Sequence, residues 1–266
     1  MKRKGIYKPT IEDIIELSGI EALHPGGMDL TRRTAELAKL KPGMKVLDVS
    51  SGRGTQSIFY AKEFGVEVTG LDISDEMIQT ANENAKIEGV SNLTSFKKGD
   101  SQFLPFGDNY FDVVINECAV GIPDDSQKVL SEMVRVAKPN GVIVIHESTW
   151  RKTLSNSEKD EISERYGTTP LEYEEWIKML QKAGVREIMT EFDEWSKPEM
   201  FWKIRKDREV NHYSKVLSSS ELNTTIKKIT QNYGEDGVKK ALENQKKFWE
   251  VVLNGTLGYC LYKGIK

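Results

Sequence analysis

From Met44 to about residue 192, short apolar runs rich in β-branched residues alternate with segments of helical periodicity, and this alternation is what most constrains the fold. Helices are predicted near 54–64, 75–88, 125–137 and 171–184, and strands at 45–49, 66–71, 93–97, 112–116, 142–147 and 186–192. Repeated strand–helix units with right-handed crossovers form a doubly wound parallel sheet. The run 142–145 is apolar without alternation, which is typical of a strand buried on both faces.

Helical patterns flank this core on both sides. Helices are predicted at 10–19, where Thr10 and Asp13 have the spacing of a capping box, and at 31–40. An apolar run at 257–262 predicts a last strand. We therefore expect an α/β single domain (1–266) with a doubly wound, Rossmann-like sheet. The sheet has seven strands, which are mostly parallel, and the C-terminal strand is antiparallel. The expected parts of the domain are a helical N-terminal cap (1–43), the core (44–193 plus 257–266) and a helical lid inserted before the last strand (194–256).

The first predicted strand runs into a glycine turn, Ser50-Ser51-Gly52-Arg53-Gly54, and the second strand ends at Asp72. A glycine turn lets the backbone approach a ligand that a Cβ atom would exclude. A carboxylate at the tip of the next strand can accept hydrogen bonds from both hydroxyls of a ribose. Because both features follow strands of one parallel sheet, they indicate a nucleotide-type site at its carboxyl edge.

Further motifs follow in order along the chain. The passage from Lys45 to Glu147 contains VLDVSSGRGT, GLDIS, KGDSQFLPFGDNYFDVV and VAKPNGVIVIHE. This passage resembles the core of class I S-adenosylmethionine (SAM)-dependent methyltransferases, of the small-molecule type grouped with the ubiquinone and menaquinone methyltransferases. The resemblance implies SAM as the cofactor and S-adenosylhomocysteine as the product.

The resemblance also implies roles for individual residues. The methionine portion would meet the turn that follows the first strand, the ribose would meet the carboxylate after the second, and adenine would meet the residues after the second and third. The implied cofactor-binding residues are Asp48, Ser50, Gly52, Gly54, Asp72, Ile73, Met77, Asp100, Ser101 and Asn116. Ser50 is a departure, because the family usually has glycine there.

Catalytic residues are less constrained than cofactor-binding ones. A sulfonium carries its own leaving group, so the protein mainly has to align the reacting atoms and exclude water, and a general base is optional. The candidates are His24 in a His-Pro-Gly-Gly loop, Glu117 at the end of the fourth strand and His146 at the end of the fifth. Each also has a structural interpretation, as a loop cap, a supporting carboxylate or a satisfied sheet residue.

The composition of the chain limits the classes of binding partner that we expect. The net charge of −3 gives no overall attraction to nucleic acid, and no window approaches the length of apolar sequence that a membrane helix needs. Cys118 and Cys260 are the only cysteines, so neither a disulfide framework nor a metal site is expected. We expect a cytoplasmic protein, monomeric or homodimeric, that binds neither nucleic acid nor membrane.

The function that these observations predict is methyl transfer to a small-molecule metabolite bound under the helical lid. Several aromatic residues in 194–256 are candidates to line its pocket, although they could equally join the helices to the sheet. Two alternatives remain open: a SAM-binding regulatory module without catalysis, and an NAD-dependent oxidoreductase. Gly99-Asp100 and the Leu-Pro-Phe segment at 104–106 argue against the second.

Overall fold

The computed structural model describes residues 7–20, 24–205 and 207–266, which belong to two compact units. Unit 1 takes residues 1–27, 148–173 and 193–259, and unit 2 takes residues 28–147, 174–192 and 260–266. Each unit is thus assembled from three separated segments of the chain. The described part of the predicted lid, 194–256, falls within unit 1, whereas the predicted cap, 1–43, is divided between the units.

The predicted doubly wound sheet is confirmed. Its strands follow the order β3-β2-β1-β4-β5-β8-β7, and β8 runs antiparallel to β7. An eighth strand, β6, has two residues and pairs with β5 away from this path, so the predicted number of seven strands omits it. The strands are β1 (Lys45–Val49), β2 (Glu67–Asp72), β3 (Thr94–Lys98), β4 (Phe111–Glu117), β5 (Ala137–Trp150), β6 (Leu171–Glu172), β7 (Arg186–Glu191) and β8 (Leu257–Ile265).

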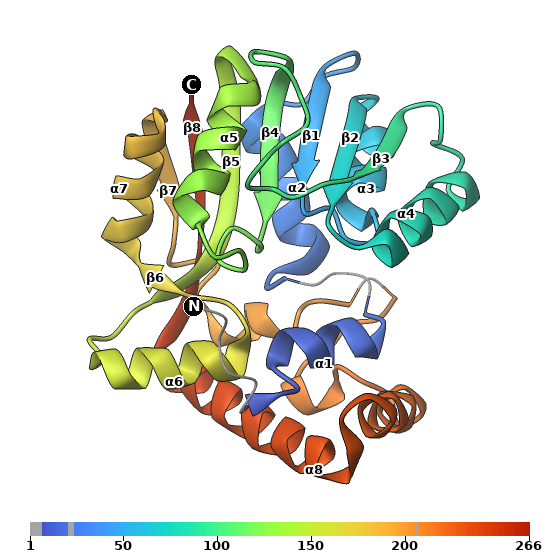
Figure 1. Cartoon of the computed structure of the whole chain (residues 1–266), viewed down its shortest axis with the longest axis vertical. Helices are drawn as coiled ribbons and strands as arrows, with labels where there is room; N and C mark the ends of the chain where they lie inside the picture. The colour runs from blue at the N-terminus through green and yellow to red at the C-terminus, as the bar shows by residue number, and fades with distance from the viewer. Residues whose placement is uncertain (1–6, 21–23, 206) are drawn as a thin grey trace. The chain divides into compact units, whose positions relative to one another are not determined.

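Apolar central strands and amphipathic helices make unit 2 a three-layer structure. Leu47 of β1, Val114 of β4 and Val144 of β5 are completely buried, because helices cover both faces of the sheet. Helices α5 and α7 lie on one face, and α2 and α3 lie on the other (Figure 1). The helices of this unit are α2 (Gly27–Ala38), α3 (Thr55–Phe64), α4 (Asp75–Ile87), α5 (Ser126–Val136) and α7 (Tyr173–Ala183).

The strand order reverses beside β1. This strand pairs in parallel with β2 on one side and with β4 on the other, so the chain builds outward in both directions from it. Ligands of such sheets bind beyond the carboxyl ends of the strands at this switch point. The turn at residues 50–54 lies there, directly after β1.

Unit 1 is mainly helical. It contains α1 (Ile11–Ser18), α6 (Asn156–Tyr166), the short 3-10 helices η2 (Pro198–Phe201) and η3 (Tyr213–Lys215), and α8 (Ser219–Leu253). Helices α1 and α6 both pack against α8. A capping box at Thr10 begins α1 as predicted, and a second capping box, at Ser218, begins α8. Gly234 has φ 69° and ψ −175°, which breaks α8 into two helical stretches.

Two predicted helix starts were wrong, and one helix was missed. The helix predicted at 171–184 begins at Tyr173, because Leu171 and Glu172 pair with β5. The helix predicted at 31–40 begins earlier, at Gly27, directly after the Pro25-Gly26 turn. Helix α6 was not predicted at all.

Among the described residues, no helix combines the length and apolarity that crossing a membrane requires.

Candidate functional site

The glycine turn after β1 is a tight backbone cradle in unit 2. Gly52 and Gly54 have φ values of 51° and 77°, a conformation that side chains rarely adopt. A Cβ atom on Gly54 would lie 2.8 Å from Cζ of Phe96 and 2.9 Å from Cβ of Ala81, so the position has no room for one. Ser50 also adopts a positive φ, 62°, which costs a residue with a side chain about 1–2 kcal/mol. The departure from glycine therefore falls on a residue that has the conformation typical of glycine.

Asp72 connects this turn to the next helix. Its Oδ2 accepts a hydrogen bond of 2.9 Å from the Gly52 amide, and its Oδ1 accepts one of 2.9 Å from the Ser74 amide. Ser74 in turn caps α4. Each carboxylate oxygen has two lone-pair sites, so capacity for further donors remains after these two bonds. Asp72 is thus both an organiser of the turn and an available acceptor at the carboxyl edge of β2.

The segment after β3 is held in place by α5. Asp100 accepts a 2.8 Å hydrogen bond from the Gln102 amide, which closes a turn. The Leu104 amide donates to Glu132 of α5 at 3.0 Å, and the Arg135 guanidinium donates to the Leu104 carbonyl at 2.9 Å. Arg135, through its hydrogen bonds, lowers the pKa of Glu132. These contacts give the Leu-Pro-Phe segment a fixed position on unit 2.

Ile73 and Met77 differ in exposure. The Ile73 side chain follows Asp72 directly and is 68% exposed, which is unusual for a large apolar residue, whereas Met77 on α4 is buried. Ser101, after β3, is also buried. An exposed isoleucine beside a nucleotide-type site is a surface on which the flat face of a base can pack.

Asp48 and Asn116 are buried residues engaged by the protein itself. The Ser57 hydroxyl donates to Asp48 Oδ2 at 2.5 Å. The Asn116 amide group donates to the Val49 carbonyl at 3.0 Å, and Asn116 Oδ1 accepts from the Ala119 amide at 2.9 Å. Asn116 therefore joins the ends of β1 and β4. Direct contact of either side chain with a cofactor stays a prediction.

Glu117 is the centre of a polar network in unit 2. The Tyr60 hydroxyl donates to one carboxylate oxygen, and the Thr31 hydroxyl donates to the other at 2.8 Å. His146 Nε2 lies 3.4 Å from Glu117 Oε2. Burial, and then the adjacent Glu117 carboxylate, raise the pKa of Tyr60 well above its usual value. The phenol consequently stays protonated, and donates to Glu117, throughout the neutral pH range.

The substitution Tyr60→Phe tests how much this network contributes to the stability of the fold. It removes one donor from a largely buried carboxylate and keeps the ring, so the free energy of unfolding should fall by about 1–3 kcal/mol. Urea denaturation measures this difference. Tyr110→Phe is the matched control, because the one hydrogen bond that the Tyr110 hydroxyl makes to a described residue is an exposed one of 3.3 Å from Lys45. Equal losses in the two variants would contradict the assignment.

The three predicted catalytic residues are divided between the units. Glu117 and His146 lie together in unit 2, at the ends of the paired strands β4 and β5. His24 lies in unit 1, where it is buried and its Nδ1 is 3.0 Å from the Pro25 carbonyl oxygen. The sequence did not indicate Tyr60 or Thr31 as partners of Glu117. No motif could have done so, since Thr31 and Tyr60 precede Glu117 by 86 and 57 residues.

Comparison with known proteins agrees with this geometry. A family model described as a methyltransferase domain matches residues 40–197. Methyltransferase GfsG of Streptomyces halstedii is 32% identical over 140 residues, which are 52% of this chain and 50% of that protein. The aligned part thus spans half the length of that curated relative.

Solved structures share the fold. The [4+2]-cyclase SpnF superposes with a TM-score of 0.75 at 21% identity, covering 98% of this chain and 93% of that one. Haemonchus contortus phosphoethanolamine N-methyltransferase 2, in complex with phosphomonomethylethanolamine and S-adenosylhomocysteine, superposes with a TM-score of 0.72 at 21% identity, covering 96% and 57%. The family model covers more than half of the chain and includes the whole carboxyl edge of β1, β2 and β3. The chain therefore belongs to the methyltransferase-domain family.

Proposed function

We propose that unit 2 binds SAM at the carboxyl edge of its sheet and that the protein transfers the SAM methyl group to a small-molecule acceptor. The observation that carries the proposal is the pairing of the Gly52 amide with Asp72 at 2.9 Å. This pairing places a glycine turn at the end of β1 next to a carboxylate at the end of β2, an arrangement that suits a nucleoside with an attached amino acid.

The residues present fit this ligand. Ser50, Gly52 and Gly54 would hold the methionine portion, with Asp48 behind them, and Asp72 would accept from the ribose hydroxyls. In the adenine pocket, the exposed Ile73 side chain would pack on the base, with Met77 below it. Asp100 would accept from the exocyclic amine, the Ser101 amide would meet a ring nitrogen, and Asn116 would fix the edge of the site.

SAM supplies a methyl group on a positively charged sulfur. Transfer would break the bond between the methyl carbon and sulfur and form a bond to the acceptor nucleophile, and S-adenosylhomocysteine would keep the electron pair. If the acceptor carries a proton, it passes to a base or to water. The protein has to align donor and acceptor and keep water away from the methyl group. Glu117, His146 and His24 stay the candidate bases. We propose that the helical segment 194–256 of unit 1 provides the acceptor site, acting as the lid.

Isothermal titration calorimetry with SAM and with S-adenosylhomocysteine tests the first part of the proposal. We expect saturable binding of both and an increase in Tm. No heat and no shift at millimolar SAM would reject it, and a parallel titration with NAD tests the oxidoreductase alternative. Release of labelled methyl over panels of phenols, amines, thiols and carboxylates tests turnover. Binding without transfer to any class would favour the regulatory module.

A further inference from the structure

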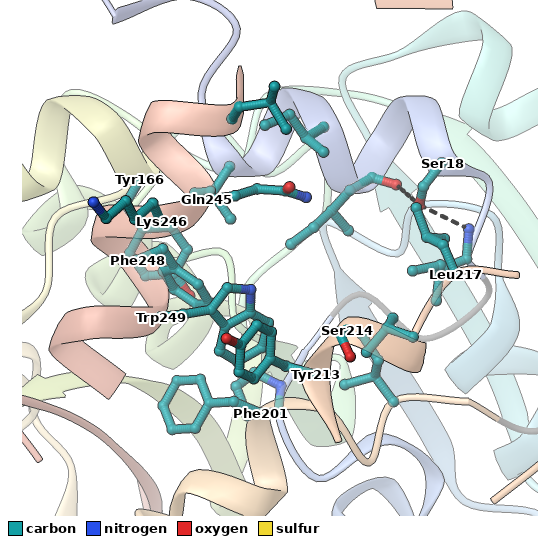
Figure 2. A pocket seen from close by; sticks show the side chains of 18 of the residues that line it. Ser18, Tyr166, Phe201, Tyr213, Ser214, Leu217, Gln245, Lys246, Phe248 and Trp249 are labelled. Carbon is teal, nitrogen blue, oxygen red and sulfur yellow. Dashed lines mark hydrogen bonds between the residues drawn. The ribbon is translucent and has the colours of Figure 1, made fainter. Parts of the chain in front are cut away.

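Unit 1 contains a cavity of about 590 Å³ (Figure 2). Its lining comes chiefly from α1, from residues 198–217 and from α8, with Tyr166 of α6, and all of these belong to unit 1. Small-molecule sites in proteins are commonly roughly 300–1,000 Å³ in volume. The cavity therefore has room for a metabolite of ordinary size without any rearrangement of the unit.

Apolar side chains of helix α8 that line this cavity are partly exposed to solvent. Leu222, Leu242 and Leu253 line it, and they are 42%, 59% and 49% exposed. On α1, Ile14 and Ile15 contribute further apolar lining. Covering apolar surface stabilises a complex by roughly 25 cal/mol per Å², and apolar side chains gathered around a concavity mark a ligand site. The ligand that gains most from this lining is itself largely apolar.

Aromatic rings give the cavity a flat wall. Tyr213 and Trp249 stack, with their ring centroids 4.7 Å apart and an interplanar angle of 24°. Phe248 meets Trp249 edge-on, at 5.0 Å and 71°. All three rings line the cavity and are labelled in Figure 2. Contacts between aromatic rings add about 0.5–1.5 kcal/mol beyond the burial of their area, which favours a planar ring system over a flexible chain.

Several polar residues of the lining are already engaged within the protein. The Ser18 hydroxyl donates to the Ile15 carbonyl, the Tyr166 hydroxyl is 3.1 Å from that of Ser148, and the Ser214 hydroxyl is 2.8 Å from Nδ1 of His212. Gln245 lies among the lining side chains in Figure 2, and its side-chain carboxamide makes no hydrogen bond to another described residue. A carboxamide can both donate and accept, so it suits one neutral polar group. Lys246 is the one lysine or arginine that lines the cavity in the described part of the chain, and the acidic Glu250 lines it too. A phosphate or diphosphate would normally be held by several cationic side chains.

We propose that this cavity binds an uncharged, largely apolar molecule with a planar ring system and one hydrogen-bonding group, which Gln245 holds. The inference also rests on the proposed function: a molecule of this chemical class would be the methyl acceptor. A phosphate ester would fit this lining poorly, because Lys246 is the one lysine or arginine among the described lining residues.

Titration of the full chain with N-phenyl-1-naphthylamine tests the cavity. This probe is uncharged, has two planar ring systems and carries one N–H donor, and its fluorescence rises in apolar surroundings. We expect saturable binding at one site. Leu242→Glu should weaken it at least tenfold, whereas Ile87→Glu should change it less than twofold, because Ile87 is 79% exposed and lies on α4 of unit 2. Leu253→Glu provides a second variant if Leu242→Glu fails to fold.

Displacement of the probe tests the polar group. We expect 2-naphthol to compete better than 2-methylnaphthalene, and Gln245→Ala to remove that preference. The proposal is overturned if Leu242→Glu and Leu253→Glu, folded as judged by circular dichroism, bind the probe as tightly as the unmodified protein. It is also overturned if phosphoethanolamine competes as well as 2-naphthol.

Failure of this inference can be distinguished from failure of the proposed function. If the unmodified protein binds the probe as expected but does not bind SAM, the proposed function fails and the cavity assignment stands. If SAM binds and only charged amino alcohols accept methyl groups, the proposed function stands and the acceptor class is wrong. Transfer to naphthols, lost in Leu242→Glu and kept in Ile87→Glu, supports both.

Discussion

Asp72→Ala should abolish detectable SAM binding in calorimetry. The substitution removes the acceptor proposed for the ribose hydroxyls, and it also removes the acceptor of the Gly52 and Ser74 amides. Hydrogen bonds to a charged group such as this carboxylate contribute about 1.5–3 kcal/mol. At 1.4 kcal/mol per factor of ten, the lost ribose contacts alone weaken binding about tenfold to more than a hundredfold, and loss of the turn geometry adds to this.

Asp75→Ala is the matched control. Asp75 is three positions away, in the first turn of α4, and its side chain is 78% exposed, where it pairs with Lys98. Removing it deletes a carboxylate of equal charge close to the same site and should leave SAM affinity nearly unchanged. Both variants should retain their circular dichroism spectra. Affinity for SAM in Asp72→Ala equal to that of the unmodified protein would show that the ribose has been placed wrongly.

Gly54→Ala should lower the free energy of unfolding by about 2–5 kcal/mol. Gly54 has φ 77°, where a side chain costs about 1–2 kcal/mol. Its new methyl group would lie 2.8 Å from the Phe96 ring and 2.9 Å from Ala81, and such overpacking costs about 1–3 kcal/mol. Because Gly54 is also the N-cap residue of α3, SAM binding should be lost together with stability.

Gly107→Ala provides the comparison for this substitution. Gly107 lies in the loop after β3, and an added Cβ atom would have no neighbour within 4 Å. It should change stability by less than about 0.5 kcal/mol, as surface substitutions usually do. Guanidinium denaturation of the two variants gives the difference directly. If both substitutions are equally mild, the turn is not the tight cradle that the structure describes.

Much of unit 2 was predictable because its physical signals are local. The apolar runs at 45–49 and 142–145 specify strands buried on both faces, and the glycine spacing specifies a turn whichever ligand it serves. The position of Asp72 at the carboxyl edge follows from the parallel direction of the strands that strand–helix units produce. These are consequences of short-range periodicity combined with one topological rule.

Other features depend on packing that no local pattern encodes. Helix α6 was missed because Ile162 and Tyr166 are its only buried apolar residues, which is too weak a periodicity to indicate a helix. Strand β6 exists only because two residues meet the end of β5. The network around Glu117 likewise depends on Tyr60, which in sequence is one more aromatic residue on a helix. The aromatic residues of 194–256 indicated a pocket, and Tyr213, Phe248 and Trp249 line the cavity of unit 1. The sequence could not indicate that α1 forms another part of its wall, because that depends on packing between distant segments.

The division of unit 1 into separated segments has a consequence for how the protein acquires its binding cavity. Lys228 on α8 donates a hydrogen bond to the Leu17 carbonyl on α1, across 211 residues of sequence. Contacts of such long range delay folding, because a large loop must close before they form. During synthesis, α1 emerges long before α8 and has to wait for it with its isoleucines uncovered. The cavity is therefore among the last parts of the protein to form and among the first that a shortened chain would lose.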